Sequence, residues 1–177
     1  LDLSSWDVSN VLSMDYMFYN ASSFNQNLSW DVSNVTNMEA MFQNASSFNG
    51  DLSTWVVSNV VDMLGMFGYA SEFNQDISTW DVSGVISMNY MFYGASSFNL
   101  DLSSWDVSNV LSMDYMFENV TLDQSNYEAT LNGWSERQVQ QGVTFDGGDS
   151  QYCDSTGRDV LTETYGWTIT DGGSVAY

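Results

Sequence analysis

Residues 73–95 read FNQDISTWDVSGVISMNYMFYGA and are one copy of a motif that recurs until about residue 120. The recurrence is marked by tryptophans at steps of 24 residues once and 25 residues three times, at Trp6, Trp30, Trp55, Trp80 and Trp105. A Met-Phe pair, Met91-Phe92 in this copy, keeps the same interval. A fixed period of this length is typical of a solenoid, in which each repeat buries its apolar face only against its neighbours.

The single 24-residue step results from a residue missing in the second repeat. Residues 27–30 read NLSW, whereas residues 51–55 read DLSTW. A one-residue slip inside a paired strand would reverse which side chains face the core. We therefore expect the slip to lie in a turn or a bulge.

The composition indicates a folded chain and restricts its partners. The 177 residues are 44% hydrophobic and carry a net charge of -21, with Arg137 and Arg158 as the only basic residues. Nucleic acids and anionic membranes need a basic footprint and are not expected as partners, whereas cations, basic proteins and neutral glycans are compatible. No apolar run is long enough to span a bilayer. Because histidine is absent and Cys153 is the single cysteine, neither a disulfide nor a zinc site is expected.

Within each repeat the spacing of the apolar residues changes. Residues 73–82 form an extended, Ser/Thr-rich segment, and the apolar residues of 85–95 then follow at steps of three, three, one and three. The second spacing is typical of one face of a short helix. Gly or Asn, which tolerate the left-handed conformation that ends a helix, follow the Met-Phe pair in four of five repeats. We therefore predict an α/β solenoid of five strand–turn–short-helix coils with one parallel sheet.

Equivalent residues of successive repeats fall into columns. One column holds the tryptophans, and a second holds Phe24, Phe48, Phe73 and Phe98. We expect both to fill the core, with a row of exposed tryptophans that stack on sugars as the alternative. A third column holds Asn25, Asn49, Asn74 and Asn99. Its amides are expected to satisfy backbone groups of adjacent repeats.

Two further columns are acidic. The first is Asp2, Asn27, Asp51, Asp76 and Asp101, and the second is Asp7, Asp31, Val56, Asp81 and Asp106. Carboxylates about 5 Å apart repel by about 1 kcal/mol per pair in water, so each must be offset by N–H donors in a local turn or by bridging calcium. Val56 favours the local role, because that repeat lacks the acid. The candidate calcium ligands are Asp76, Asp81, Asp101 and Asp106, with Asp146 and Asp149 in a later Gly-rich turn for which a plain turn is the alternative.

Tyrosines flank the Met-Phe pair and lie off the apolar positions. They are Tyr16, Tyr19, Tyr90, Tyr93 and Tyr115. Exposed tyrosines among Ser, Asn and Asp are typical of adaptable binding surfaces. We interpret these five as candidate partner-binding residues, with packing on the next repeat as the alternative.

The period stops near residue 121, and we divide the chain into repeats (1–120) and a C-terminal capping segment (121–177). In the second part, residues 127–134 are expected to form a short helix ended by glycine, and residues 143–145 a strand. A helix over 156–165, ended by Gly166, and a last strand over 167–170 follow. Such a segment seals the last repeat from water.

The repeat W-D-V-S-N-V-x-x-M-x-x-M-F-x-x-A-S-x-F-N-x-D-[LI]-S resembles the BspA-like surface-protein repeats, a leucine-rich-repeat variant also found in Mycoplasma-type lipoproteins. The segments LNGW (131–134), GVTF (142–145) and YGWTI (165–169) resemble the cap that ends such arrays in bacterial secreted proteins. The resemblance implies a leucine-rich-repeat-like fold, an extracellular or cell-surface location and a role in adhesion or protein recognition. It implies no catalytic residues.

These observations together predict a non-enzymatic interaction or adhesion module, a rigid acidic scaffold that binds a protein or a glycan. The alternative is a structural spacer, or a calcium-stiffened stalk, of a larger surface adhesin. Repeated acids create repeated equivalent sites, whereas catalysis needs one asymmetric constellation, so no enzyme and no cofactor besides calcium is expected. Because the chain begins within a repeat, we expect a monomeric fragment of a longer protein.

Overall fold

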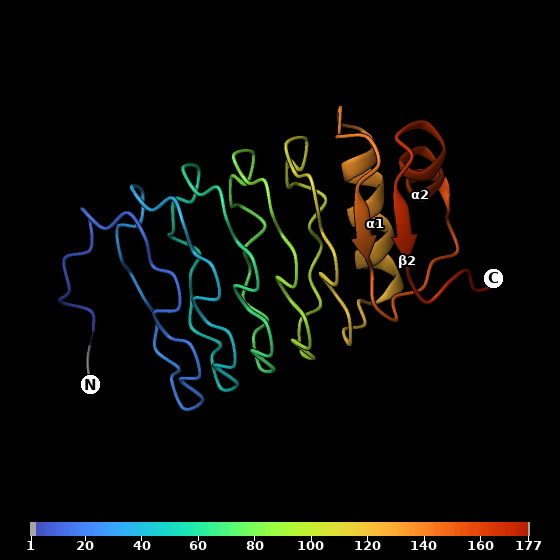
Figure 1. The fold of residues 1–177 in the computed structure, drawn as a ribbon. Coiled ribbons are helices and arrows are strands. Elements are labelled where there is room, and N and C mark those ends of the chain that lie inside the picture. The colour runs from blue at the N-terminus through green and yellow to red at the C-terminus, as the bar shows by residue number, and fades with distance from the viewer. Residues whose placement is uncertain (1–2, 177) are drawn as a thin grey trace.

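The computed structural model describes residues 3–176, with its regular elements at the C-terminal end (Figure 1). They are the helix α1 (Gln124–Ser135), the strand β1 (Thr144–Asp146), the helix α2 (Thr156–Asp159), the π-helix η1 (Val160–Thr164) and the strand β2 (Thr168–Thr170). β1 and β2 form a two-stranded parallel sheet in which Thr144 faces Thr168. None of the helices in the described part of the chain is long and apolar enough to cross a membrane.

The repeats lie side by side in a row that leads to this C-terminal segment (Figure 1). Single parallel bridges join neighbouring repeats at one equivalent position, through Ser13, Asn37, Asp62, Ser87 and Ser112. A further parallel bridge, from Met113 to Phe145, continues the series into β1. The C-terminal segment therefore extends the same parallel arrangement of backbone.

The backbone N–H groups of each repeat alternate between two kinds of acceptor. In residues 88–94 the even-numbered N–H groups donate to carbonyls 24 residues further on, as from Phe92 to Met116 at 3.0 Å. The odd-numbered N–H groups of residues 91–95 donate to carbonyls three residues back, as from Tyr93 to Tyr90 at 3.1 Å. Three of these donors thus close turns within the repeat, and the other four bind the next repeat.

The strand and the short helix predicted in each repeat are wrong, because residues 3–123 contain turns and single bridges but no strand and no helix. An α-helix would point its N–H groups along its own axis rather than toward the neighbouring repeat, and a segment of about eight residues is too short to be stable by itself. The three-residue apolar steps fit consecutive three-residue turns equally well. The left-handed conformation itself is confirmed, with φ between 61° and 64°, at Asn20, Asn44, Gly94 and Asn119, and Tyr69 adopts it as well, at 57°.

The predicted position of the one-residue slip is confirmed. In four repeats the tryptophan N–H closes a turn with the carbonyl three residues earlier, as from Trp80 to Ile77 at 3.1 Å. The second repeat, one residue shorter, runs through residues 27–30 without a turn. The bridge from Ser13 to Asn37 lies beyond the missing residue and keeps its register.

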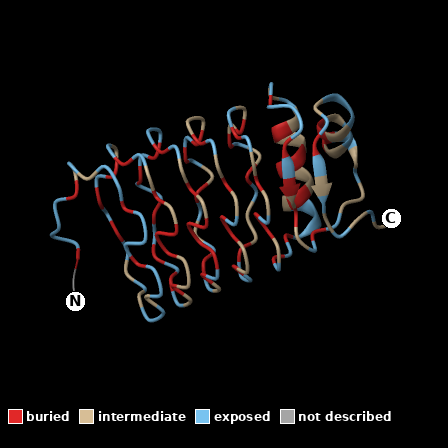
Figure 2. Cartoon of the chain, in the orientation of Figure 1, coloured by how far each residue is buried: buried red, intermediate tan, exposed pale blue. Residues whose placement is uncertain are grey.

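Buried residues recur in each repeat (red in Figure 2). The aromatic columns belong to this core, as predicted, apart from the exposed Trp6 and the partly buried Phe24 in the N-terminal repeats. The second to fifth tryptophans are at most 4% exposed, and each donates its Nε1–H to a carbonyl of the preceding repeat, as Trp105 does to Ile77 at 3.0 Å. Phe67 stacks on Phe73, six residues further along the chain, at 3.9 Å and on Phe92, its equivalent in the next repeat, at 5.7 Å. Trp6 differs, since it is 49% exposed and stacks against Trp30 at the edge of the column.

The asparagine column joins the repeats along a second line. The side-chain oxygen of each asparagine accepts the backbone N–H of the equivalent residue in the next repeat, as Asn49 does from Asn74 at 3.0 Å. Asn99 continues the series to the N–H of Asp123, which caps α1. The predicted role of these amides is therefore confirmed.

The predicted elements after residue 121 are present with shifted bounds. The helix predicted over 127–134 is α1, and it continues through Gly133 rather than ending there. A Cβ on Gly133 would lie 2.4 Å from the Ser103 carbonyl oxygen, so this glycine permits close packing of α1 on the last repeat. The helix predicted over 156–165 is α2 with η1, and Gly166 follows it at φ +67°. The division at residue 120 stays a prediction.

Substitution of two tryptophans of the same column tests this core. We expect Trp80→Ala to lower the free energy of unfolding by about 3–5 kcal/mol, because it empties a buried position and removes a hydrogen bond to Leu52. Trp6→Ala, the matched control, should cost about 1 kcal/mol or less, because half of that side chain is exposed. Urea unfolding followed by circular dichroism measures both, and equal effects would contradict this account of the core.

Candidate functional site

Six tyrosines form the surface that we call the tyrosine face: Tyr16, Tyr19, Tyr69, Tyr90, Tyr93 and Tyr115. Four of them touch in sequence across three repeats, Tyr69 with Tyr93 at 5.0 Å, Tyr93 with Tyr90 at 5.8 Å and Tyr90 with Tyr115 at 4.9 Å between ring centroids. Five of the six are 39–49% exposed, and Tyr93 is half-buried. The face therefore presents a continuous aromatic cluster to solvent at its C-terminal end.

Backbone conformation holds these side chains outward. Tyr16, Tyr69, Tyr90 and Tyr115 have φ of 57° or 58°. Bulky residues rarely adopt this left-handed conformation, which costs about 1–2 kcal/mol. The turn around Tyr90 is fixed by hydrogen bonds, since its N–H donates to Asp114 at 2.9 Å and its carbonyl accepts from Tyr93. The tyrosine rings are thus attached to backbone that hydrogen bonds hold in place.

The five predicted tyrosines do not form one patch. Tyr16 and Tyr19 make a separate pair at 5.5 Å, because the second and third repeats carry Ala40 and Gly65 at the position of Tyr16. The sequence reasoning missed Tyr69, which joins the C-terminal cluster. Its left-handed position is occupied by Asn or Gly in the other repeats, and this departure was the signal.

Carboxylates lie beside the tyrosine rings. The Tyr16 hydroxyl donates to Glu39 at 2.5 Å, and this contact raises the pKa of Tyr16. The pKa of Tyr93 is also raised, first by its hydrogen bond with Tyr69 and next by the charge of Glu118. Both phenols are therefore uncharged at neutral pH.

Two hollows meet at the C-terminal end of the tyrosine face, between the last repeat and the sheet. One, of about 280 Å³, is lined by Asp114, Tyr115, Thr144, Phe145, Asp146 and Thr170. The other, of about 410 Å³, is lined by Tyr115, Glu118, Asn119, Asp146, Gly148, Asp149 and Thr170. We call the two together the acidic junction. They share Tyr115, Asp146 and Thr170, so the aromatic cluster ends directly in an acidic depression.

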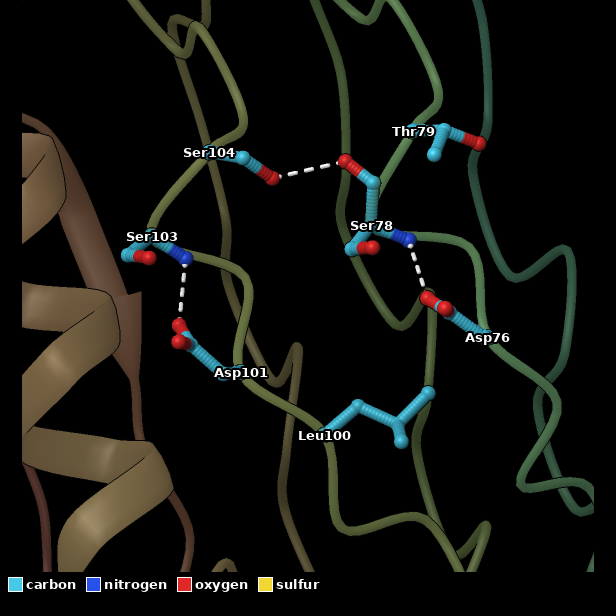
Figure 3. Close-up of a pocket in the computed structure, with 7 residues that line it drawn as sticks. All are labelled: Asp76, Ser78, Thr79, Leu100, Asp101, Ser103 and Ser104. Atoms are coloured by element: carbon cyan, nitrogen blue, oxygen red, sulfur yellow. Dashed lines mark hydrogen bonds between the residues drawn. The ribbon is translucent and has the colours of Figure 1, made fainter.

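The first acidic column caps turns. Asp76 accepts the N–H of Ser78 at 2.9 Å, and Asp101 accepts that of Ser103 at 2.8 Å (Figure 3). Both line an open hollow of about 630 Å³ in which the Ser104 hydroxyl donates to the Ser78 carbonyl. The hydroxyl and N–H of Ser78 hold the pKa of Asp76 below its ordinary value. Asp2 lies outside the described residues.

The aspartates of the second acidic column also cap turns. Asp81 accepts the N–H and the hydroxyl of Ser83 at 3.1 and 2.6 Å, and Asp106 accepts the N–H of Ser108 at 3.0 Å. These are the local Asx turns that the sequence predicts, so the capping role is confirmed for both columns.

Asp146 and Asp149 are also held by hydrogen bonds, one within the turn and one to the last repeat. Asp146 accepts the N–H of Gly148 at 2.8 Å, and the N–H of Asp149 donates to Val120 at 3.1 Å. Within residues 3–176, no group of three or more Asp, Glu, Cys or His side chains is arranged to hold a metal ion. Calcium binding by the six predicted aspartates stays a prediction.

A column of exposed aliphatic residues was also missed by the sequence reasoning. Leu12, Val61, Ile86 and Leu111 are 42–64% exposed, with Thr36 at the equivalent position of the second repeat. Their backbones link neighbouring repeats, as from the N–H of Ile86 to Val61 at 2.9 Å. The signal was an aliphatic residue recurring at a variable position of the motif.

The hydrogen bonds of the acidic columns predict a pKa change at one aspartate. Asp31 accepts the hydroxyl of Ser33 at 2.6 Å and its N–H at 3.1 Å, and these donors lower the pKa of Asp31 below 3.8. Ser33→Ala should therefore raise this pKa toward 3.8, as measured by NMR titration of the carboxyl carbon. Ser108→Ala, which removes the equivalent hydroxyl at Asp106, is the control and should leave the pKa of Asp31 unchanged.

Ser33→Ala should also change how the stability of the fold depends on pH. Because the folded pKa of Asp31 is lowered, its ionised form stabilises the fold above the unfolded pKa, and this contribution is lost as the pH falls through the folded pKa. Ser33→Ala should be less stable than the wild type at pH 7, and the difference should narrow below about pH 4. An unchanged Asp31 pKa in Ser33→Ala would show that the hydroxyl bond is not responsible.

Comparison with known proteins places the chain in a family. The family model described as "Mycoplasma protein of unknown function, DUF285" matches residues 1–69 and 51–146. No curated protein and no solved structure matches the chain. Because the two matched segments together span residues 1–146 of 177, the chain belongs to the family described as Mycoplasma protein of unknown function, DUF285.

Proposed function

We propose that the chain is a non-enzymatic interaction module that binds a protein or a glycan through the tyrosine face. We further propose that it acts outside the cell or on the cell surface, as a leucine-rich-repeat-like solenoid of five coils of the BspA-like kind. The observation that carries the proposal is the cluster of Tyr69, Tyr90, Tyr93 and Tyr115, four touching rings on a hydrogen-bonded backbone.

The physical argument begins with what exposed tyrosine offers a partner. A tyrosine ring supplies a large contact area with few rotatable bonds, and its hydroxyl forms hydrogen bonds at the edge of the contact. Here the rings also restrict one another, as the 4.9 Å contact between Tyr90 and Tyr115 indicates. Less conformational entropy is therefore lost on binding, which favours affinity.

The repeated architecture makes a second contribution to the affinity for a partner. Equivalent positions of successive repeats lie side by side, so one partner can contact several of them at once (Figure 1). Weak contacts that share one rigid frame reinforce each other, because each raises the effective concentration for the next. The pair of Tyr16 and Tyr19, toward the N-terminal end of the row, offers a second point of attachment.

Tyrosine variants test the proposal on glycan and protein arrays. Tyr90→Asn with Tyr115→Asn removes two rings but keeps residues that tolerate the left-handed backbone. We expect the partners bound by the wild type to bind at least tenfold more weakly. Leu111→Thr is the matched control, because it changes an exposed side chain of the same repeat to the Thr36 of the second repeat. It should retain binding.

The alternative, a spacer or calcium-stiffened stalk, makes the opposite prediction. A spacer would capture no partner on either array, or only partners whose binding is equal in the tyrosine variant and the control. A calcium-stiffened stalk would in addition melt at a higher temperature in millimolar calcium than in excess chelator. Either array result would overturn the tyrosine face as a binding surface.

A further inference from the structure

We infer that the partner of the tyrosine face is an arginine-containing basic polypeptide segment, whose guanidinium groups lie on the exposed rings and enter the acidic junction. The inference rests on the proposed function and specifies the chemistry of the partner. It stands on the contact between the aromatic cluster and the two acidic hollows at Tyr115.

The charge balance of this surface is the first argument. Asp114, Glu118, Asp146 and Asp149 line the acidic junction together with Tyr115. The chain has two basic residues, and both are engaged elsewhere. Arg158 pairs with Asp171 at 2.8 Å, and Arg137 donates to the carbonyls of Gly133 and Ser104. These four carboxylates therefore have no positive side chain of their own chain to balance them, and a cationic partner complements them.

The aromatic rings select the kind of cation. A cation over the face of a tyrosine is attracted by the ring, and guanidinium also stacks on it through its planar shape. Tyr90 and Tyr115 are 39% and 46% exposed, so their outer surfaces are accessible. A guanidinium that lies on Tyr115 is at the mouth of both hollows, where a carboxylate can accept two of its N–H groups.

The extent of the surface favours a polypeptide over a small ion. The touching rings run from the third repeat to the fifth, and the junction continues to Thr170 in β2. Two steps of about 4.8 Å between repeats, with the junction beyond, match a few residues of extended chain. The carboxylates are divided between two hollows, with Asp114 in one, Glu118 and Asp149 in the other and Asp146 in both, which suits several separate guanidinium groups better than one compact ion.

The test is calorimetric binding of short peptides to the whole chain. A peptide with alternating arginine and glycine is the probe, and its citrulline version, with the same shape but no charge, is the control. We expect the arginine peptide to bind, a lysine version to bind several-fold more weakly, and the citrulline version not to bind. Raising salt from about 50 to 200 mM should weaken binding, because charge contacts are screened.

Paired variants locate the site. Glu118→Gln with Asp149→Asn removes two carboxylates from the junction, and Tyr115→Asn removes the ring between the hollows. Each should weaken arginine-peptide binding at least tenfold. Asp7→Asn with Asp31→Asn makes the same change in net charge in the second acidic column, where Asn can still cap the turn, and should change binding less than twofold.

The outcomes separate this inference from the proposed function. Equal weakening by both carboxylate pairs would mean diffuse charge attraction, and binding of the citrulline peptide, or of no peptide at millimolar concentration, would overturn the basic partner. If the arrays then still yield a partner whose binding depends on Tyr90 and Tyr115, such as a neutral glycan, the proposed function stands and the cationic partner does not. If neither experiment shows tyrosine-dependent binding, both proposals are wrong.

Discussion

The structure depends on how each repeat divides its backbone N–H groups between itself and its neighbour. Between residues 90 and 95, alternate donors close turns within the repeat or bind the following one, and the preceding repeats use the same pattern. A helix would point its N–H groups along its own axis instead of at the neighbouring repeat, and a regular strand would not turn the chain back. Alternating donors achieve both results. Each short repeat turns the chain back and also bonds to the next repeat.

This division also explains why equivalent residues meet. The hydrogen bonds between repeats set the register, and the register brings Trp80 beside Trp55, Phe67 beside Phe92 and Asn49 beside Asn74. Aromatic stacking and the asparagine series then stabilise the arrangement that the backbone establishes. The same geometry places the exposed rings of Tyr90 and Tyr115 in contact, so the frame that builds the core also builds the proposed binding surface.

The sequence allowed the periodic features to be predicted and left the local backbone open. The period, the buried tryptophans, the asparagine series, the Asx turns and the left-handed Asn or Gly after the Met-Phe pair followed from the types of residues and their spacing. The left-handed conformation of Tyr16, Tyr69, Tyr90 and Tyr115 was not predicted. The prediction of short helices was wrong, because apolar steps of three suit a helix and a chain of turns equally, and the acceptors of Phe92 and its neighbours lie in another repeat. For the same reason the tyrosines could be proposed individually, but their separation into a pair and a cluster with Tyr69 required the contacts across repeats.

The most direct test of this account is NMR detection of scalar couplings through hydrogen bonds, which identifies each donor nitrogen with its acceptor carbonyl carbon. The account predicts a correlation from the nitrogen of Phe92 to the carbonyl carbon of Met116, and one from Tyr93 to Tyr90. Together they would establish the alternation within one repeat. Correlations from Phe92 to Met88 and from Tyr93 to Asn89, four residues back in each case, would mean a helix and would contradict it.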